Sequence, residues 1–296
     1  MIDFSELILT NTGAIYHLNL TPDMIANKII LVGDPDRVTK IGKRMSIVHH
    51  EVQHREFHTL TGILNGEPVS VISTGIGTDN IDIVLTELDA LVNIDFNTRT
   101  LKPHHTRLKI LRLGTCGGVQ ADIPTGSLVY SKFSIGSDGL MGFYHYPKPH
   151  VLENLVNSFT DFTQTQGISP LPFIPYASSS PENWLTILYE KYPHIHTGIT
   201  FTGNGFYGPQ GRSLGRIELK LNDLEKKLEQ FTFQHDRILN IEMETSGILG
   251  MANALGHEAG SLSVILANRS QKTFHSDVEE AVEKLIDTGI ELFHQL

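Results

Sequence analysis

Two arginines beside glycines form the first candidate site in the sequence. Arg37 comes four residues after Gly33 in the stretch GDPDR, and Arg112 begins the stretch RLGTCGG. A guanidinium is costly to bury unless it meets an anion, and its planar fork fits phosphate. The hydroxyl of Thr115 and the turn amides of residues 114–118 would supply further donors. The spacing therefore predicts a phosphate site, and the alternative is a strand-end arginine paired with a structural carboxylate.

A second candidate is the pair of carboxylates in NIEMET, residues 240–245. On an extended segment Glu242 and Glu244 share one face, and Met243 lies on the other. Carboxylates accept hydrogen bonds from sugar hydroxyls, and methionine offers a soft apolar wall. The pattern indicates a sugar-binding wall, with a solvated acidic turn before the helical segment TSGILGMANAL as the alternative.

A third candidate is the stretch FYGPQGR, residues 206–212. Gln210 and Arg212 stand two positions apart and together offer donors and an acceptor to a planar ring that carries two carbonyls and an N–H. Phe206 could pack against such a ring. A plain surface turn explains the glycines and the proline equally well.

The stretch HEVQH, residues 50–54, matches the helical zinc-peptidase motif in its letters. In such an enzyme the two histidines lie one helical turn apart and bind the metal. The flanking Val48, Val52 and Phe57 favour a strand instead, which would place the two histidines about 13 Å apart. A zinc peptidase is therefore a remote alternative.

Cys116 is the single cysteine of the chain. A nucleophilic thiol needs a neighbouring base and a lowered pKa, and no histidine is paired with Cys116 by spacing. The sequence indicates a small buried residue inside the glycine-rich stretch. A single cysteine also excludes an intrachain disulfide.

The candidate residues follow short apolar runs that are typical of buried strands. Such runs occur four times, and each of the first three is expected to end at a glycine turn, at positions 33, 75 and 114. Helical periodicity places Ile81, Val84, Leu85, Leu88 and Val92 on one face, and the C-terminal helix is expected to open with a capping box, Ser276 and Glu279. Buried strands interleaved with helices predict an α/β sandwich with a mixed, partly parallel sheet, whose ligands sit at the carboxyl ends of the strands. The strands are expected in residues 28–37, 68–77, 108–118 and 261–269, and the helices in residues 80–92 and 276–293.

Residues 140–200 hold many Pro, His and Ser and are expected to form a long irregular excursion with some helix. Whether this segment closes over the site as a lid stays open. The chain shows no clean linker, so one domain over residues 1–296 is expected.

Composition excludes several classes of protein. The 296 residues carry a formal charge of −10, without the basic face that a non-specific nucleic-acid binder needs. No apolar stretch approaches the roughly 20 residues of a membrane span, and the N-terminal sequence lacks the order of a signal peptide. We therefore expect a cytoplasmic protein with small-molecule partners, no nucleic acid and no membrane.

Taken together, the motifs resemble the nucleoside phosphorylase family. GDPDR, HREF, STGIG, RLGTCGG, FYGPQGR, NIEMET and LANRSQ occur in that family's order and approximate spacing, over about residues 15–275. Within the family they are most similar to the uridine phosphorylases. The resemblance implies a three-layer α/β/α sandwich around a twisted mixed sheet.

The resemblance also implies roles for individual residues. Arg55 would reach phosphate in a neighbouring subunit, and His17 would cross the same interface toward the ribose 5′-hydroxyl, so the active unit would be at least a dimer. Arg112, Glu244, Gln210 and Arg212 would carry the catalysis. Whether Glu56 of HREF binds a monovalent cation stays open. The implied phosphate ligands are Gly33, Arg37, Arg55, Arg112 and Thr115, and the implied nucleoside ligands are His17, Phe206, Gln210, Arg212, Glu242, Met243, Glu244 and Arg269.

The implied reaction is phosphorolysis of uridine to uracil and ribose 1-phosphate. Its transition state is similar to an oxocarbenium ion, phosphate itself is the nucleophile, and no cofactor or metal is needed. Purine-specific relatives tend to carry an aspartate near LANRSQ, and here the stretch Asn268–Arg269–Ser270 holds no acid. The alternatives are a purine nucleoside phosphorylase, a nucleosidase, or a nucleoside-binding protein without turnover.

Overall fold

The computed structural model describes residues 1–168 and 170–296. A twelve-stranded mixed sheet runs through it in the order β11-β12-β10-β8-β13-β7-β1-β4-β3-β2, with β9 beside β8 and β14 beside β13. The strands β4, β1, β7 and β13 are parallel neighbours, as are β8, β10 and β12. The bounds are β1 (Lys28–Val32), β2 (Ile47–His54), β3 (Phe57–Leu64), β4 (Glu67–Ser73), β7 (Lys109–Gly118), β8 (Leu128–Gly136), β9 (Tyr176–Ser179), β10 (His196–Thr202), β11 (Thr232–Phe233), β12 (Asp236–Glu242), β13 (Glu258–Asn268) and β14 (Thr273–Phe274), while β5 (Ile94–Asp95) and β6 (Thr100–Leu101) form a separate pair.

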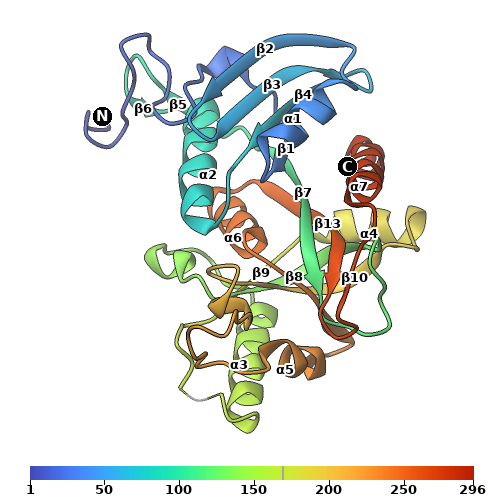
Figure 1. Ribbon diagram of the computed structural model, residues 1–296. Coiled ribbons are helices and arrows are strands. Elements are labelled where there is room, and N and C mark those ends of the chain that lie inside the picture. The colour runs from blue at the N-terminus through green and yellow to red at the C-terminus, as the bar shows by residue number, and fades with distance from the viewer. Residues whose placement is uncertain (169) are drawn as a thin grey trace.

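Helices cover both faces of this sheet, which gives the three layers (Figure 1). Helices α1, α4 and α7 pack on one face, while α2 and α6 pack on the other and against each other. Helices α3 and α5 lie over the end of the sheet that carries β10 and β12. The helices are α1 (Pro35–Gly42), α2 (Thr78–Asn93), α3 (His150–Thr165), α4 (Glu182–Lys191), α5 (Leu224–Gln230), α6 (Thr245–Leu255) and α7 (Val278–Gln295), with short 3₁₀ turns η1 (Pro22–Met24), η2 (Leu140–Phe143) and η3 (Gly208–Gln210).

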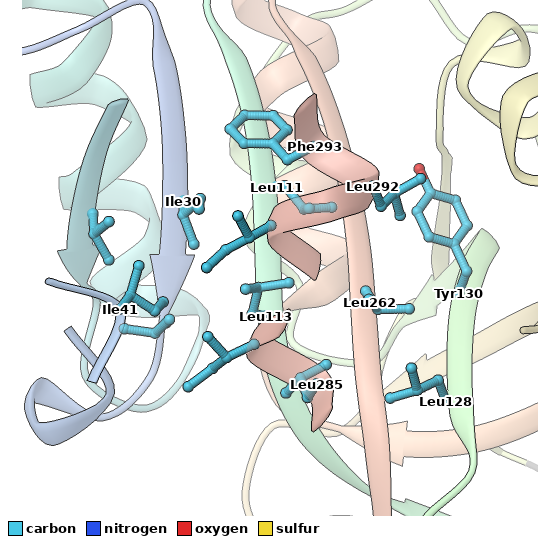
Figure 2. Packing of buried hydrophobic residues seen from close by; sticks show 14 of the residues in the cluster. Ile30, Ile41, Leu111, Leu113, Leu128, Tyr130, Leu262, Leu285, Leu292 and Phe293 are labelled. Atoms are coloured by element: carbon cyan, nitrogen blue, oxygen red, sulfur yellow. The ribbon is translucent and has the colours of Figure 1, made fainter. Parts of the chain in front are cut away.

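The central strands are apolar on both faces because each face is covered. In β1, Ile30 and Val32 belong to the cluster under α1 and α7, whereas Ile29 and Leu31 belong to the cluster under α2 and α6. Figure 2 shows the first cluster, where Leu285 and Leu292 of α7 lie over β7 and β13. Two buried faces on one strand are typical of a parallel sheet between helical layers.

Most of the elements expected from the sequence are confirmed. The four buried runs form β1, β4, β7 and β13, and the 80–92 helix is α2, with its periodic residues buried. The HEVQH stretch lies in strand β2, as its flanks indicate. In the described residues, the helices are all too short or too polar to cross a bilayer.

Three local expectations are wrong. Strand β7 does not turn at Gly114 but continues to Gly118, because its backbone stays paired with β13 along that length. The C-terminal helix is capped by Asp277, whose side chain accepts from the Glu280 amide, and not by Ser276. Residues 140–200 are more regular than expected, since they contain α3, β9, α4 and most of β10; Ser169 of this segment lies outside the described residues.

Candidate active site

A cavity of about 910 Å³ opens at the carboxyl ends of the central strands. Loops at this edge converge because parallel strands end on the same side of a sheet. The walls come from the turn after β1, the loop after β4, strand β7, the end of β12, strand β13 and the 206–212 loop. Ten of the residues predicted for phosphate or nucleoside binding line it, namely Gly33, Arg37, Arg112, Thr115, Phe206, Gln210, Arg212, Glu242, Met243 and Glu244.

Arg112 lies buried at the centre of this cavity, in the middle of β7 and not at the strand end that the sequence suggested. Its Nη2 is 2.6 Å from Oε2 of Glu244 and 3.1 Å from Oε2 of Glu242, and its Nη1 donates to Ser263 at 3.1 Å. The side chain folds back over Gly114, where a Cβ would overlap the guanidinium. Glycine at 114 therefore makes room for the arginine; it does not make a turn.

Arg37 is the second buried guanidinium of the cavity. It comes from the first turn of α1, and its Nη1 donates to the Leu113 carbonyl at 3.0 Å. Its Nε has no hydrogen-bond partner in the described part of the chain. Burial, and then the charge of Arg112, lower the pKa of Arg37. An anion in the cavity would offset the repulsion between the two cations.

The carboxylates of Glu242, the last residue of β12, and of Glu244 both face Arg112 and are buried; they do not form a solvated turn. The Glu242 carboxylate accepts from the hydroxyl of Thr202 at 2.6 Å and from the amides of Glu244 and Thr245 at 2.9 Å each. It therefore caps the start of α6, which satisfies donors that a helix N-terminus leaves free.

Glu244 keeps more of its carboxylate for the cavity. Its Oε1 accepts from the Gly77 amide at 2.8 Å and its Oε2 faces Arg112. Burial raises the pKa of Glu244 and the charge of Glu242 adds to this shift, while Arg112 opposes it. Glu244 is thus a buried acceptor held in place from two sides.

The other wall of the cavity carries Phe206, Gln210 and Arg212. The Arg212 guanidinium carbon lies 4.1 Å from the centroid of the Phe206 ring. Its Nη1 donates to the Gln210 side-chain oxygen and to the Phe206 carbonyl at 3.3 Å. Gln210 is only 2% exposed. An aromatic ring, an amide and a guanidinium on one wall suit a flat polar ring.

Comparison with known proteins places this geometry in a family. The family model of the phosphorylase superfamily matches residues 27–295. The chain belongs to the phosphorylase superfamily. It is 30% identical over 270 residues to a uridine phosphorylase of Thermococcus kodakarensis, which covers 90% of this chain and 81% of that protein. A purine nucleoside phosphorylase of DeoD type from Oceanobacillus iheyensis is 24% identical over 283 residues, covering 91% of this chain and 98% of that protein.

A solved structure agrees with the family. The nucleoside phosphorylase of Trypanosoma brucei, described as showing uridine phosphorylase activity, superposes with a TM-score of 0.87 at 28% identity, covering 98% of this chain and all of that one. The protein is therefore an enzyme of the pentosyltransferase class with the nucleoside phosphorylase fold.

Three predicted residues of this phosphorylase do not line the cavity. Arg55 is exposed in the turn between β2 and β3, where its guanidinium lies over the Tyr16 ring. His17 pairs through Nδ1 with Glu87 at 2.7 Å. Arg269 lies behind the 206–212 loop and donates to the carbonyls of Gln210 and Gly211. The places of Arg55 and His17 outside the cavity leave their predicted role in a neighbouring subunit as a prediction.

The zinc-peptidase geometry is not formed in this phosphorylase. Because β2 is a strand, His50 and His54 are not one helical turn apart, and His54 donates through Nδ1 to the His17 carbonyl at 2.8 Å. Among the described residues, the side chains that come close enough to share an ion are Asp89, His105 and His257, which lie outside the HEVQH stretch.

Cys116 lines the cavity, but its thiol is not activated. Burial raises the pKa of Cys116 to about 12, so the thiol stays protonated at neutral pH. The Sγ–H donates to the Val264 carbonyl at 3.5 Å. The interpretation of Cys116 as a bystander agrees with this environment.

Sequence reasoning missed several residues that line the cavity. Ile76 lies in the loop after β4 and Asn80 in the helix that follows. The glycines of this loop predicted a ligand site there, but they did not indicate which side chains would line it. Phe274 lies in β14, a short strand that pairs antiparallel with β13. This strand is too short for a periodic pattern in the sequence to predict it. The remaining unpredicted polar side chains in the lining are Asp34 and Glu56.

Proposed function

We propose that this enzyme is a uridine phosphorylase, which converts uridine and phosphate to uracil and ribose 1-phosphate. The observation that carries the proposal is the Arg37–Arg112 pair, with an unpaired Nε on Arg37, facing the same cavity as Gln210 and Arg212. A hydrolytic nucleosidase has no use for Arg37, a buried cation that no carboxylate pairs with among the described residues.

Phosphate would bind between Arg37 and Arg112 and attack C1′ of the ribose. The new C1′–O bond forms as the C1′–N1 bond breaks, and the electron pair of the broken bond leaves with uracil. The two guanidiniums position the nucleophile, and the phosphate charge in turn stabilises the positive ribose ring. Glu244 would accept hydrogen bonds from ribose hydroxyls while Arg112 keeps its carboxylate ionised.

Uracil leaves with negative charge spread over its ring carbonyls. Arg212 and the Gln210 amide would donate to those oxygens, and Phe206 would stack on the ring. These contacts strengthen as the charge develops, so they favour the transition state over the bound substrate.

Asn268 offers no acid to a bound base, which fits the proposed pyrimidine substrate. Its Nδ2 donates to the carbonyls of Gln120 at 2.8 Å and Ile123 at 2.7 Å, and its Oδ1 accepts from the Gln271 amide at 2.9 Å. All of these partners are backbone groups of neighbouring loops. The amide therefore holds the structure together and presents no acid to a purine ring.

We expect Asn268→Asp to destabilise the protein without creating inosine cleavage. The carboxylate would lie against two carbonyl oxygens and leave them without donors, which costs about 3 kcal/mol. Thermal unfolding and an inosine assay measure the two effects. A stable variant that cleaves inosine would show that position 268 chooses the base.

The proposed reaction is tested by incubating uridine with purified enzyme, with and without phosphate, and inosine in parallel. Uracil release that requires phosphate, with little cleavage of inosine, supports the proposal. Release without phosphate would identify a hydrolase, and inosine cleavage would identify a purine enzyme. Binding of uridine without turnover would identify a nucleoside-binding protein.

We expect Arg212→Ala to lower kcat for uridine about 10²-fold, because it removes a donor to the departing base. The melting temperature should change little, since the hydrogen bonds that the Arg212 side chain makes in the described chain go only to its own loop. Steady-state kinetics beside a thermal melt checks this. An unchanged kcat would remove Arg212 from the site.

A further inference from the structure

Two arginines lie close together at the 206–212 loop: Arg212 lines the cavity, and Arg269 lies behind the loop. A Cβ on Gly117 would lie 3.3 Å from Nη2 of Arg212 and 3.8 Å from Cδ of Arg269, so both side chains cross the same glycine. Burial lowers the pKa of each arginine, and the charge of Arg269 lowers the pKa of Arg212 further. Such a pair needs a countercharge to stay packed.

Glu225 of helix α5 supplies that countercharge. Its Oε2 is 3.3 Å from Nη2 of Arg269, and both side chains are largely buried. The start of α5 also packs on the 206–212 loop, since a Cβ on Gly211, at φ +69°, would lie 2.9 Å from Cβ of Leu224. The carboxylate is therefore fixed on a helix that already touches the loop.

Arg269 connects Glu225 to the two residues proposed to bind the base. Its guanidinium donates to the backbone carbonyls of Gln210 and Gly211, and in the loop Gln210 accepts from Arg212 through its side chain. A continuous series of contacts thus leads from Glu225 through Arg269 to Gln210 and Arg212. Neither Glu225 nor Arg269 lines the cavity.

We propose that Glu225 is a positioning residue for the departing base: it holds Arg269 against the loop carbonyls and so fixes Gln210 and Arg212. The inference rests on the proposed function of the cavity, because it assigns these two side chains to the base. One carboxylate beside two guanidiniums leaves one positive charge for the uracil anion. Loss of Glu225 loosens the loop without touching the phosphate side.

The test is a double-mutant cycle on Glu225→Gln and Arg269→Lys, with kinetics for both substrates. Glu225→Gln should raise KM for uridine or lower kcat about 10-fold and leave KM for phosphate unchanged. In the Arg269→Lys background the same change should have little further effect, because Glu225 acts through Arg269. A change that only weakens folding would lower the active fraction and leave both KM values alone.

The matched control is Glu229→Gln, which removes the same charge one turn later on α5, where the side chain contacts Ser270. It should behave as the wild type. The inference would be overturned if Glu225→Gln changed the uridine kinetics equally in the wild type and in Arg269→Lys. It would also be overturned if Glu229→Gln changed them as much as Glu225→Gln does.

A readout that does not depend on turnover separates this inference from the proposed function. Trypsin cleaves after Arg216 and Lys220, which are exposed in the loop that follows Arg212. Glu225→Gln and Arg269→Lys should each speed that cleavage, and the double variant should not add to it. If the wild type fails to cleave uridine, the proposed function is wrong, and the additivity of the cleavage rates still decides whether the Glu225–Arg269 contact holds the loop.

Discussion

Replacing Arg37 with methionine is expected to lower kcat/KM for phosphate about 10³-fold, the largest effect of any substitution considered. Arg37 is the cation with a free buried donor, since its Nε has no partner in the described chain. Arg112, in contrast, is already paired with two carboxylates. The positive charge that an incoming phosphate meets is therefore mainly that of Arg37. Initial rates over a phosphate titration at saturating uridine measure the effect.

Two further variants make the result interpretable. Arg37→Lys keeps the charge but not the planar fork, so it should recover only part of the activity. Arg44→Met removes the same charge close by, but Arg44 pairs with Glu283 and Asp287 away from the cavity, and its phosphate titration should match the wild type. A normal phosphate titration for Arg37→Met would place the anion elsewhere.

The strands were predictable because their burial leaves a local signal. A strand covered on both faces is largely apolar, and β1 shows this most clearly, while β4 and β13 combine apolar residues with buried serines such as Ser70 and Ser263. The meeting of Glu242 and Glu244 was predictable in part, since alternate residues of an extended segment share a face, although the chain bends at residues 243–244. These features depend on residues that are neighbours in the chain.

Features set by distant partners were not predictable. The glycines of RLGTCGG suggested a turn. Strand β7 nevertheless stays extended through them, because β13, about 150 residues later, pairs with it. Position 114 requires glycine because a Cβ there would overlap the Arg112 side chain. The residue preferences of turns do not predict such a requirement. Helix α3 is a different case: Leu152, Leu155 and Phe159 have helical spacing and are buried, and the many Pro, His and Ser around them hid a signal that was present.

The pairing of Arg112 shows that two alternatives need not exclude each other. The sequence opposed a phosphate site to a structural salt bridge, and the structure places Arg112 in the cavity and in a salt bridge at once. The carboxylates there are the proposed sugar ligands, so the ion pair joins the two halves of the site. In the proposed function, Arg112 would couple the phosphate side to the ribose side.

Glu244→Gln tests that coupling, and we expect kcat for uridine to fall about 10²-fold. The amide is nearly the same size but carries no charge, so it accepts more weakly from ribose hydroxyls and no longer balances the buried Arg112. The proposed role requires the ionised carboxylate. Burial raises the pKa of Glu244. As the pH is lowered, wild-type activity should therefore begin to fall at a higher pH than the protonation of an ordinary glutamate would give.

The pH profile distinguishes this role from a loss of fold. In Glu244→Gln the position no longer titrates, so the acid limb that belongs to Glu244 should disappear from the profile of kcat/KM for uridine. Glu242→Gln is the matched comparison. It removes the same charge two residues earlier in the chain, from the carboxylate that caps α6. It should lower the melting temperature more than Glu244→Gln does, because it weakens a helix cap. If Glu244→Gln kept the acid limb of the wild type, the titrating group would be another residue, and Glu244 would serve only to neutralise Arg112.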